Sequence, residues 1–134
     1  MHRPTFVFDG DCAFCSSCAR FIENRIRPAA DVVAWQFSDL DALGLTEEQA
    51  GAAVQWVSAG RAPTAGPVAI ADLLKTAPGL AGRLLWRRRR RARAAPGHRP
   101  GLPVYRWVAR NRHRMPGGTA ACALPPDHPA RAGR

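Results

Sequence analysis

A chain of 134 residues is the size of one domain and long enough for a single modest core. Its net charge of +10 is uneven, since residues 1–82 hold six basic and nine acidic residues whereas residues 83–134 hold fourteen basic residues and one acidic residue. Nothing approaches the roughly 18 consecutive apolar residues that span a bilayer. No charged start followed by a long apolar region is present, so we expect a cytoplasmic protein, in which thiols are kept reduced.

The first predicted element is a short buried strand at Thr5 to Phe8, which ends before Gly10. Asp11 has the residue type of a helix N-cap, so we expect a helix from about Cys12 to Arg25. Residues on this helix recur at three- and four-residue spacing and predict one buried face, made of Phe14, Cys15, Cys18, Phe21 and Ile22. A strand, an acidic turn and a helix therefore surround the two cysteines of a CxxC motif.

The middle of the chain alternates between strand and helix signals. Thr46, with Gln49 three residues later, has the form of a capping box and starts a short helix. Pro67 opens a second helix, at a position where the missing amide is not needed. Apolar, β-rich runs predict three further strands, at Val32 to Phe37, Ala53 to Val57 and near Arg61 to Thr64. This order of elements is typical of a small mixed sheet with helices.

The C-terminal part is basic and less regular. Five consecutive arginines, Arg87 to Arg91, precede a loop rich in proline and glycine at Ala94 to Pro103. Helical spacing returns over Val104 to Arg112. We expect this helix to dock on the core through one side, which carries Val104, Trp107, Val108 and Asn111.

The CxxC pair carries the main functional hypothesis. A helix N-terminus favours a thiolate, and a CxxC at a first strand-to-helix junction is typical of a thioredoxin-like redox site. We expect Cys12, as the more exposed thiol, to attack a substrate disulfide and Cys15 to resolve the mixed disulfide, with no cofactor required. Asp9 is a candidate proton acceptor for Cys15, although a carboxylate that braces the turn explains it equally well.

Two separated blocks of the chain match one known family together. The first is FDGDCAFC, which contains Asp9, Cys12 and Cys15, and the second is YRWVARNRHR at 105–114, followed by Cys122. In both blocks the chain resembles the DCC family of thiol-disulfide oxidoreductase-like proteins, named for an Asp-Cys-Cys signature. The resemblance covers roughly Thr5 to Leu124. It implies disulfide exchange with a protein or small-molecule substrate.

The same resemblance implies an α/β, thioredoxin-like fold, with a small central mixed sheet flanked by helices and a basic C-terminal helical extension. We expect one domain over residues 1–124, which includes the basic segment 83–103 and the docking helix 104–112, followed by a flexible tail at 125–134. Thioredoxin-like proteins usually place a cis-proline before the third strand, and no proline precedes Ala53 to Val57 here. Disulfide exchange itself needs only the two thiols.

A metal site is the first alternative. Cys12, Cys15 and Cys18 form CxxCxxC, and Cys122 supplies a fourth thiolate with which zinc or an iron-sulfur cluster could be held. The Cys-Pro dipeptide typical of such iron-sulfur runs is absent after Cys18. Cys18 on its own fits a small buried core residue, and Cys122 is open to a packing or a redox role. The redox pair is therefore the favoured interpretation.

A module that binds nucleic acid or an anionic surface is the second alternative. The run Arg87 to Arg93 is dense enough to attract a polyanion, but no recognised nucleic-acid motif accompanies it. A solvated basic face explains the run more simply. Nucleic acid is therefore retained only as an alternative partner.

Overall fold

The computed structural model describes residues 3–79, 102–119 and 122. Four strands form one sheet in the order β2-β1-β3-β4. The inner strand β1 (Thr5–Phe8) runs parallel to β2 (Asp31–Ala34) and antiparallel to β3 (Gln55–Val57), which pairs antiparallel with β4 (Thr64–Ala65). The expected mixed sheet is confirmed, and the order of strands and helices is that of a thioredoxin-like α/β fold.

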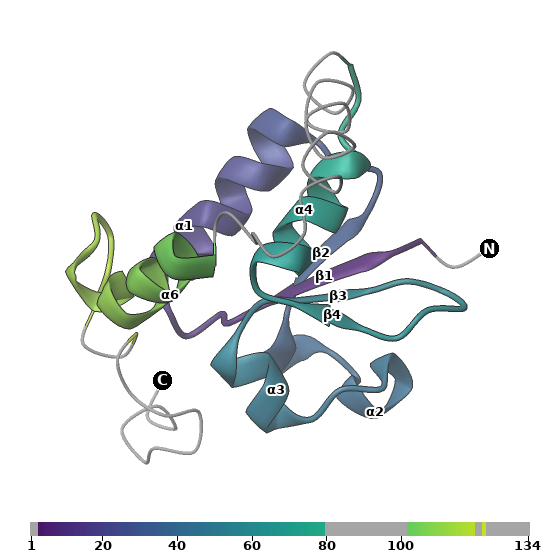
Figure 1. The fold of residues 1–134 in the computed structure, drawn as a ribbon, viewed down its shortest axis with the longest axis horizontal. Helices are drawn as coiled ribbons and strands as arrows, with labels where there is room; N and C mark the ends of the chain where they lie inside the picture. Colours follow the sequence, from purple (N-terminus) through teal and green to yellow (C-terminus); the bar gives the residue numbers. More distant parts are fainter. Residues whose placement is uncertain (1–2, 80–101, 120–121, 123–134) are drawn as a thin grey trace.

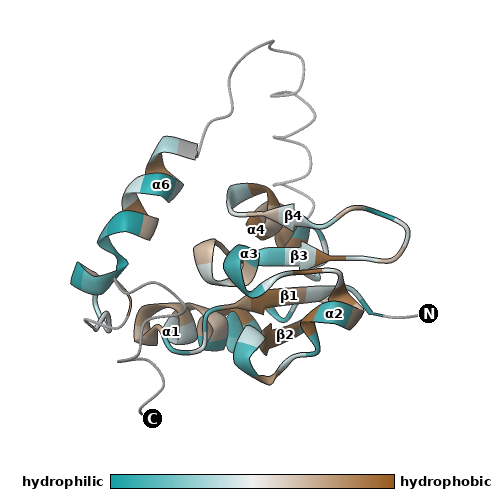
Figure 2. Ribbon diagram, turned by 90° about the horizontal axis from the view of Figure 1, so that it is seen from below, coloured by the Kyte–Doolittle hydropathy of each residue, from teal (hydrophilic) through white to brown (hydrophobic). Residues whose placement is uncertain are grey.

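Helices cover both faces of this sheet (Figure 1). One face carries α1 (Ala13–Phe21), α4 (Pro67–Lys75) and, beside α1, α6 (Leu102–Asn111). The other face carries α2 (Leu40–Leu43) and α3 (Glu47–Ala52). Shorter helical turns follow α1, β2 and α6, namely η1 (Ile22–Ile26), η2 (Trp35–Phe37) and η3 (Arg112–Arg114). The view in Figure 2 shows α6 standing at the end of α1, at the edge of the layered core.

Local hydrogen bonds account for where the helices begin. The capping box at α3 is confirmed, because Thr46 Oγ1 accepts from the Gln49 amide at 3.2 Å and Gln49 Oε1 accepts from the Thr46 amide at 3.0 Å. Pro67 opens α4 as predicted. At α1 the N-cap is Cys12, so the prediction of Asp11 is wrong. The Asp11 amide instead donates to Asp9 Oδ1 at 3.2 Å and belongs to the turn.

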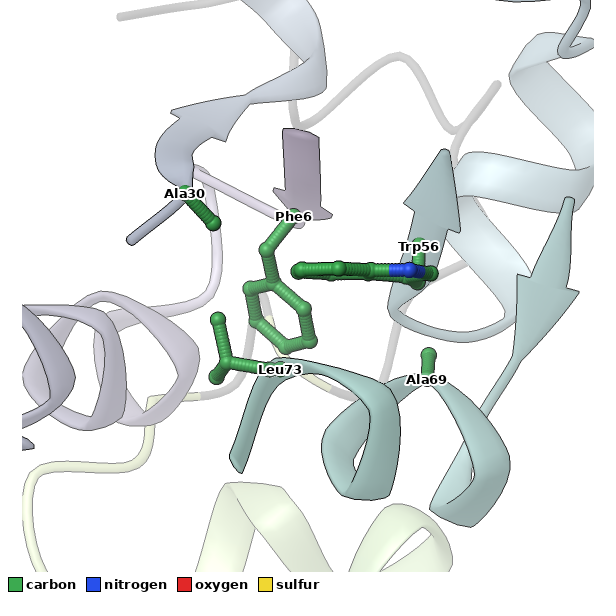
Figure 3. Packing of buried hydrophobic residues seen from close by; sticks show 5 residues of the cluster. All are labelled: Phe6, Ala30, Trp56, Ala69 and Leu73. Carbon is green, nitrogen blue, oxygen red and sulfur yellow. The ribbon is translucent and has the colours of Figure 1, made fainter. Parts of the chain in front are cut away.

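The core lies between the sheet and α4. Figure 3 shows Phe6 of β1 with its ring between Trp56 of β3 and Leu73 of α4. Ala30 and Ala69 complete this buried cluster. Burying one such large apolar side chain contributes about 1.5–3 kcal/mol. The cluster therefore fixes α4 to the two inner strands and leaves the carboxyl end of β1 free to form the turn that carries the cysteines.

Two predicted elements differ from the structure in the first half of the chain. β2 ends at Ala34, and the residues predicted to continue it form η2, in which Phe37 is 92% exposed. On α1, Phe21 is 59% exposed rather than buried. The π-helical turn η1 follows directly after Phe21 and has more residues per turn than an α-helix. A buried face predicted from constant α-helical spacing is therefore wrong at this point.

α6 is present as predicted, and Val108 of the predicted docking side faces the core, but two other residues of that side do not. Val104 and Trp107 are 67% and 60% exposed, so their predicted docking role is wrong. The side that faces the core carries Tyr105, whose ring contacts Gly66, and Arg112 just beyond the helix. Val108 therefore faces the core together with Tyr105 and Arg112, and apolar periodicity alone does not identify the last two.

Several predictions concern residues that the structure does not describe. The run Arg87 to Arg93, the tail 125–134 and nearly all of the basic segment 83–103 lie outside the described ranges. Their predicted roles therefore stay predictions. In the part of the chain that is described, no helix is both long enough and apolar enough to cross a membrane.

Candidate functional site

The turn after β1 is shaped by a contact with the end of β2. The Gly10 amide donates to Gln36 Oε1, and Gln36 Nε2 donates to Asp9 Oδ1, both at 3.0 Å. A Cβ atom on Gly10 would stand 2.8 Å from the Cβ of Ala34, which is closer than real Cβ contacts allow. Only glycine fits here, and the close approach sets the direction in which the chain enters α1.

The two thiols of the CxxC differ in exposure. Cys12 is 0% exposed, whereas Cys15 is partly exposed, so the prediction that Cys12 is the more accessible thiol is wrong. The cause is local, because Cys12 caps α1 and its Sγ accepts from the Cys15 amide at 3.5 Å. The side chain of Cys122 lies close to that of Cys12 and lowers its pKa. Cys15, one turn further along, keeps part of its surface exposed.

A hydrogen bond between the two thiols separates their pKa values. The Cys12 side chain lowers the pKa of Cys15 below its ordinary value of 9.0, against the opposing effect of burial. The Arg112 guanidinium lowers this pKa further, and the Asp9 carboxylate raises it. The same hydrogen bond, together with burial, raises the pKa of Cys12. Cys15 is therefore the thiol that carries negative charge more readily.

Arg112 joins the parts of the site from the end of α6. Its Nη1 lies 3.8 Å from Asp9 Oδ2, and its Nε donates to the carbonyl oxygen of Cys122 at 2.6 Å. The same guanidinium hydrogen-bonds with the side chain of Cys15. The sequence patterns placed Arg112 off the docking side and gave it no role. Its position seven residues after Tyr105, two turns along one helix face, was the signal that could have identified it.

Asp9 lies in the site, as its place in the motif predicted. Its side chain is 3% exposed and accepts hydrogen bonds from the Asp11 amide and from Gln36. Its other oxygen faces Arg112. These contacts brace the turn and anchor the arginine that lies beside Cys15. The role of Asp9 as a proton acceptor for Cys15 stays a prediction.

A cavity of about 210 Å³ opens beside Cys15, between α1, the segment that joins α3 to β3, and α6. Cys15 lines this cavity, whereas Cys12 does not. Its charged lining residues within the described ranges are Asp9 and Arg112, and most of its wall is apolar, including Phe8, Phe14, Ile22, Val54 and Val108. An apolar cavity with one activated thiol and a few polar groups is the usual form of a small binding site.

Among the described residues, the cysteines are not grouped as the alternative of a metal centre requires. Cys18 is exposed, so its predicted role as a buried core residue is also wrong. Over residues 3–79, 102–119 and 122, no three or more His, Cys, Asp or Glu side chains are grouped so as to hold a metal ion. This arrangement gives the zinc or iron-sulfur interpretation no support.

Arg112→Gln is expected to raise the pKa of Cys15, because the substitution removes a positive charge and a hydrogen bond that both lower it. The measurement is the pH dependence of Cys15 alkylation by iodoacetamide, with the modified peptide quantified by mass spectrometry. Arg110→Gln is the matched control, because Arg110 is an exposed arginine of the same helix. An alkylation profile that stays unchanged in Arg112→Gln contradicts this account of the thiol.

The site lies within a segment that matches a known protein family. The family model described as DCC1-like thiol-disulfide oxidoreductase matches residues 6–118. The match includes Asp9, both CxxC cysteines and Arg112, while Cys122 lies beyond its end. No curated protein and no solved structure matches the chain.

Proposed function

The chain belongs to the DCC1-like thiol-disulfide oxidoreductase family, and from this premise we propose that Cys12 and Cys15 are the two thiols that exchange disulfides. Membership makes thiol-disulfide exchange the activity of the chain. The observation that supports the assignment of residues is the hydrogen-bonded pair of thiols, in which the partly exposed one has the lowered pKa. Such a difference in pKa between neighbours is typical of redox-active cysteine pairs.

Within this pair we assign the attack to Cys15 and the resolution to Cys12, which reverses the order expected from the sequence. Cys15 lines the cavity and is the better thiolate, whereas Cys12 is buried behind it. The Cys15 thiolate attacks one sulfur of a substrate disulfide, and the other substrate sulfur leaves as a thiolate. Cys12 then gives its proton to the first substrate thiolate and attacks the Cys15 sulfur, which releases the second substrate thiolate. The products are a reduced substrate and a Cys12–Cys15 disulfide.

We further propose that the substrate is a protein or small-molecule disulfide with an apolar group beside its sulfur. The mostly apolar wall of the cavity next to Cys15 supports this choice. We place the reaction in the cytoplasm, where paired cysteines are more often catalytic than structural. Binding of nucleic acid by Arg87 to Arg93 stays an untested alternative, because that run lies outside the described residues.

A redox titration of the full chain tests the proposal. The protein is equilibrated with glutathione buffers of graded potential, quenched in acid, alkylated and analysed by mass spectrometry. We expect a disulfide between Cys12 and Cys15 to form within the range of cytosolic potentials, roughly −220 to −320 mV. The Cys12→Ser variant cannot form this disulfide, so its peptide spectrum gives the background signal. If the disulfide never forms in the unaltered chain, the proposed function fails.

A further inference from the structure

The site contains a third thiol that the exchange described above does not use. Cys122 is 1% exposed, and its side chain lies close enough to that of Cys12, which is 0% exposed, to lower the pKa of Cys12. The sulfur of Cys12 therefore has two thiol neighbours, Cys15 along the helix and Cys122 from the far end of the chain. Cys122 is brought there by the tertiary fold, since it lies outside the CxxC turn and beyond the family match.

Hydrogen bonds hold Cys122 in this position. Its amide donates to the Thr119 carbonyl at 3.0 Å, and Thr119 Oγ1 lies 3.7 Å from its sulfur. Its own carbonyl accepts from Arg112 Nε at 2.6 Å. Because Arg112 also contacts Asp9 and Cys15, the backbone of Cys122 is tied to the same charged group as the CxxC thiol.

A packing role is the simpler alternative for a buried cysteine, which often behaves as a small apolar residue. The surroundings of Cys122 differ from a core environment, because its sulfur lies beside a hydroxyl group and another thiol. A sulfur in contact with one member of a redox pair is placed to exchange with it, since the reaction requires only direct contact of sulfur atoms.

We propose that Cys122 is a third redox thiol, which takes over the disulfide after Cys15 and Cys12 have formed it. The Cys122 thiol loses its proton to solvent by way of the exposed Thr119 hydroxyl beside it, and its sulfur attacks the sulfur of Cys12. The Cys12–Cys122 bond forms, the Cys12–Cys15 bond breaks, and the electron pair leaves on Cys15, where Arg112 stabilises the thiolate. No further oxidant is consumed, because the oxidising equivalents come from the substrate disulfide. This inference rests on the proposed function of the CxxC pair.

The exchange would give the protein a buried oxidised state. With the disulfide at Cys12 and Cys122, both bonded sulfurs lie where solvent does not reach them. Cys15 is then free again as a thiolate at the cavity. A small thiol could reduce the protein only after Cys15 had attacked Cys12 and formed the accessible Cys12–Cys15 disulfide again.

Disulfide mapping of the full chain tests this proposal, because trypsin separates the thiols concerned. Cys12, Cys15 and Cys18 fall in the tryptic peptide that ends at Arg20, and Cys122 falls in the peptide 115–131. The protein is treated with one equivalent of oxidised glutathione, quenched in acid, alkylated and digested without reduction. We expect the two peptides to be linked through Cys12 and Cys122, with Cys15 alkylated.

Three variants separate the possible outcomes. Cys122→Ala is expected to lose the linkage and to accumulate the disulfide within the first peptide, whereas Cys18→Ser is expected to retain the linkage. Cys15→Ser is expected to form it much more slowly, because the variant lacks the activated thiol through which the oxidant enters the pair. A Cys12–Cys15 disulfide without any linkage in the unaltered chain overturns this inference and leaves the proposed function intact. A linkage that forms as fast in Cys15→Ser also overturns it, and the absence of both disulfides overturns the two proposals together.

Discussion

Cys15→Ser is expected to reduce disulfide exchange to the rate measured without protein. The substitution removes the thiolate that meets the substrate, and the remaining thiol of the motif, Cys12, is buried and has a raised pKa. The measurement is reduction of a small aromatic disulfide, followed by the absorbance of the released thiol, with a regenerating reductant in excess. Cys18→Ser is the matched control, because Cys18 lies one turn further along α1 and is exposed.

Cys12→Ser provides the complementary result for the order of attack. Without a resolving thiol, the mixed disulfide between Cys15 and the substrate should accumulate and be recovered on the peptide that ends at Arg20. If the mixed disulfide instead accumulates on Cys12 in the Cys15→Ser variant, then Cys12 is the attacking thiol and the order expected from the sequence was right. The two variants therefore distinguish the two orders with one assay.

Leu73→Ala is expected to lower the free energy of unfolding by about 2–5 kcal/mol, the range observed when a large aliphatic side chain in a core is truncated. Leu73 is 0% exposed and packs on Phe6 and Trp56, so its loss leaves a cavity that α4 and two strands cannot easily close. A loss of this size is a large fraction of the roughly 5–15 kcal/mol that stabilises a typical domain. Urea denaturation followed by tryptophan fluorescence measures it, because Trp56 lies in the same cluster.

Val68→Ala is the control for this measurement. Val68 belongs to the same helix but is 41% exposed, so we expect a change within about 0.5 kcal/mol. Because alanine favours the helix at both positions, equal losses in both variants would mean that the burial of Leu73 adds nothing to stability. The account of the core given above would then be wrong.

The parts of the fold that the sequence predicted are those with local causes. The strand before Gly10, the capping box at Thr46 and the helix start at Pro67 each depend on residues within four positions of one another. The predicted end of β2 was wrong because nothing local distinguishes the extended run from the turn that follows it. Side-chain alternation continues through Phe37, although the chain has already left the sheet.

In the candidate site, too, only the residues with local causes could be predicted. Asp9, Cys12 and Cys15 were predicted to lie together because they are close in the sequence and have the spacing of a redox motif. Arg112 was assigned no contact, because Asp9 and Cys15 lie about a hundred positions earlier in the chain, and Cys122 was placed with the CxxC cysteines only as a possible fourth thiolate or redox residue. The relative burial of Cys12 and Cys15 was predicted in the wrong order, because the N-cap was assigned to Asp11 whereas the Cys12 side chain caps α1.

The contact between Gly10 and the end of β2 means that the neighbouring strand helps to position the two thiols. Ala34 and Gln36 never meet the substrate in our scheme, yet they set the path of the turn from which both thiols project. A larger side chain at position 34 would push the turn outward and carry Asp9, and the arginine that it anchors, away from Cys15. Residues of the scaffold can thus alter the acidity of the thiol without touching sulfur, and natural variation at these two positions would tune the enzyme while leaving its motif unchanged.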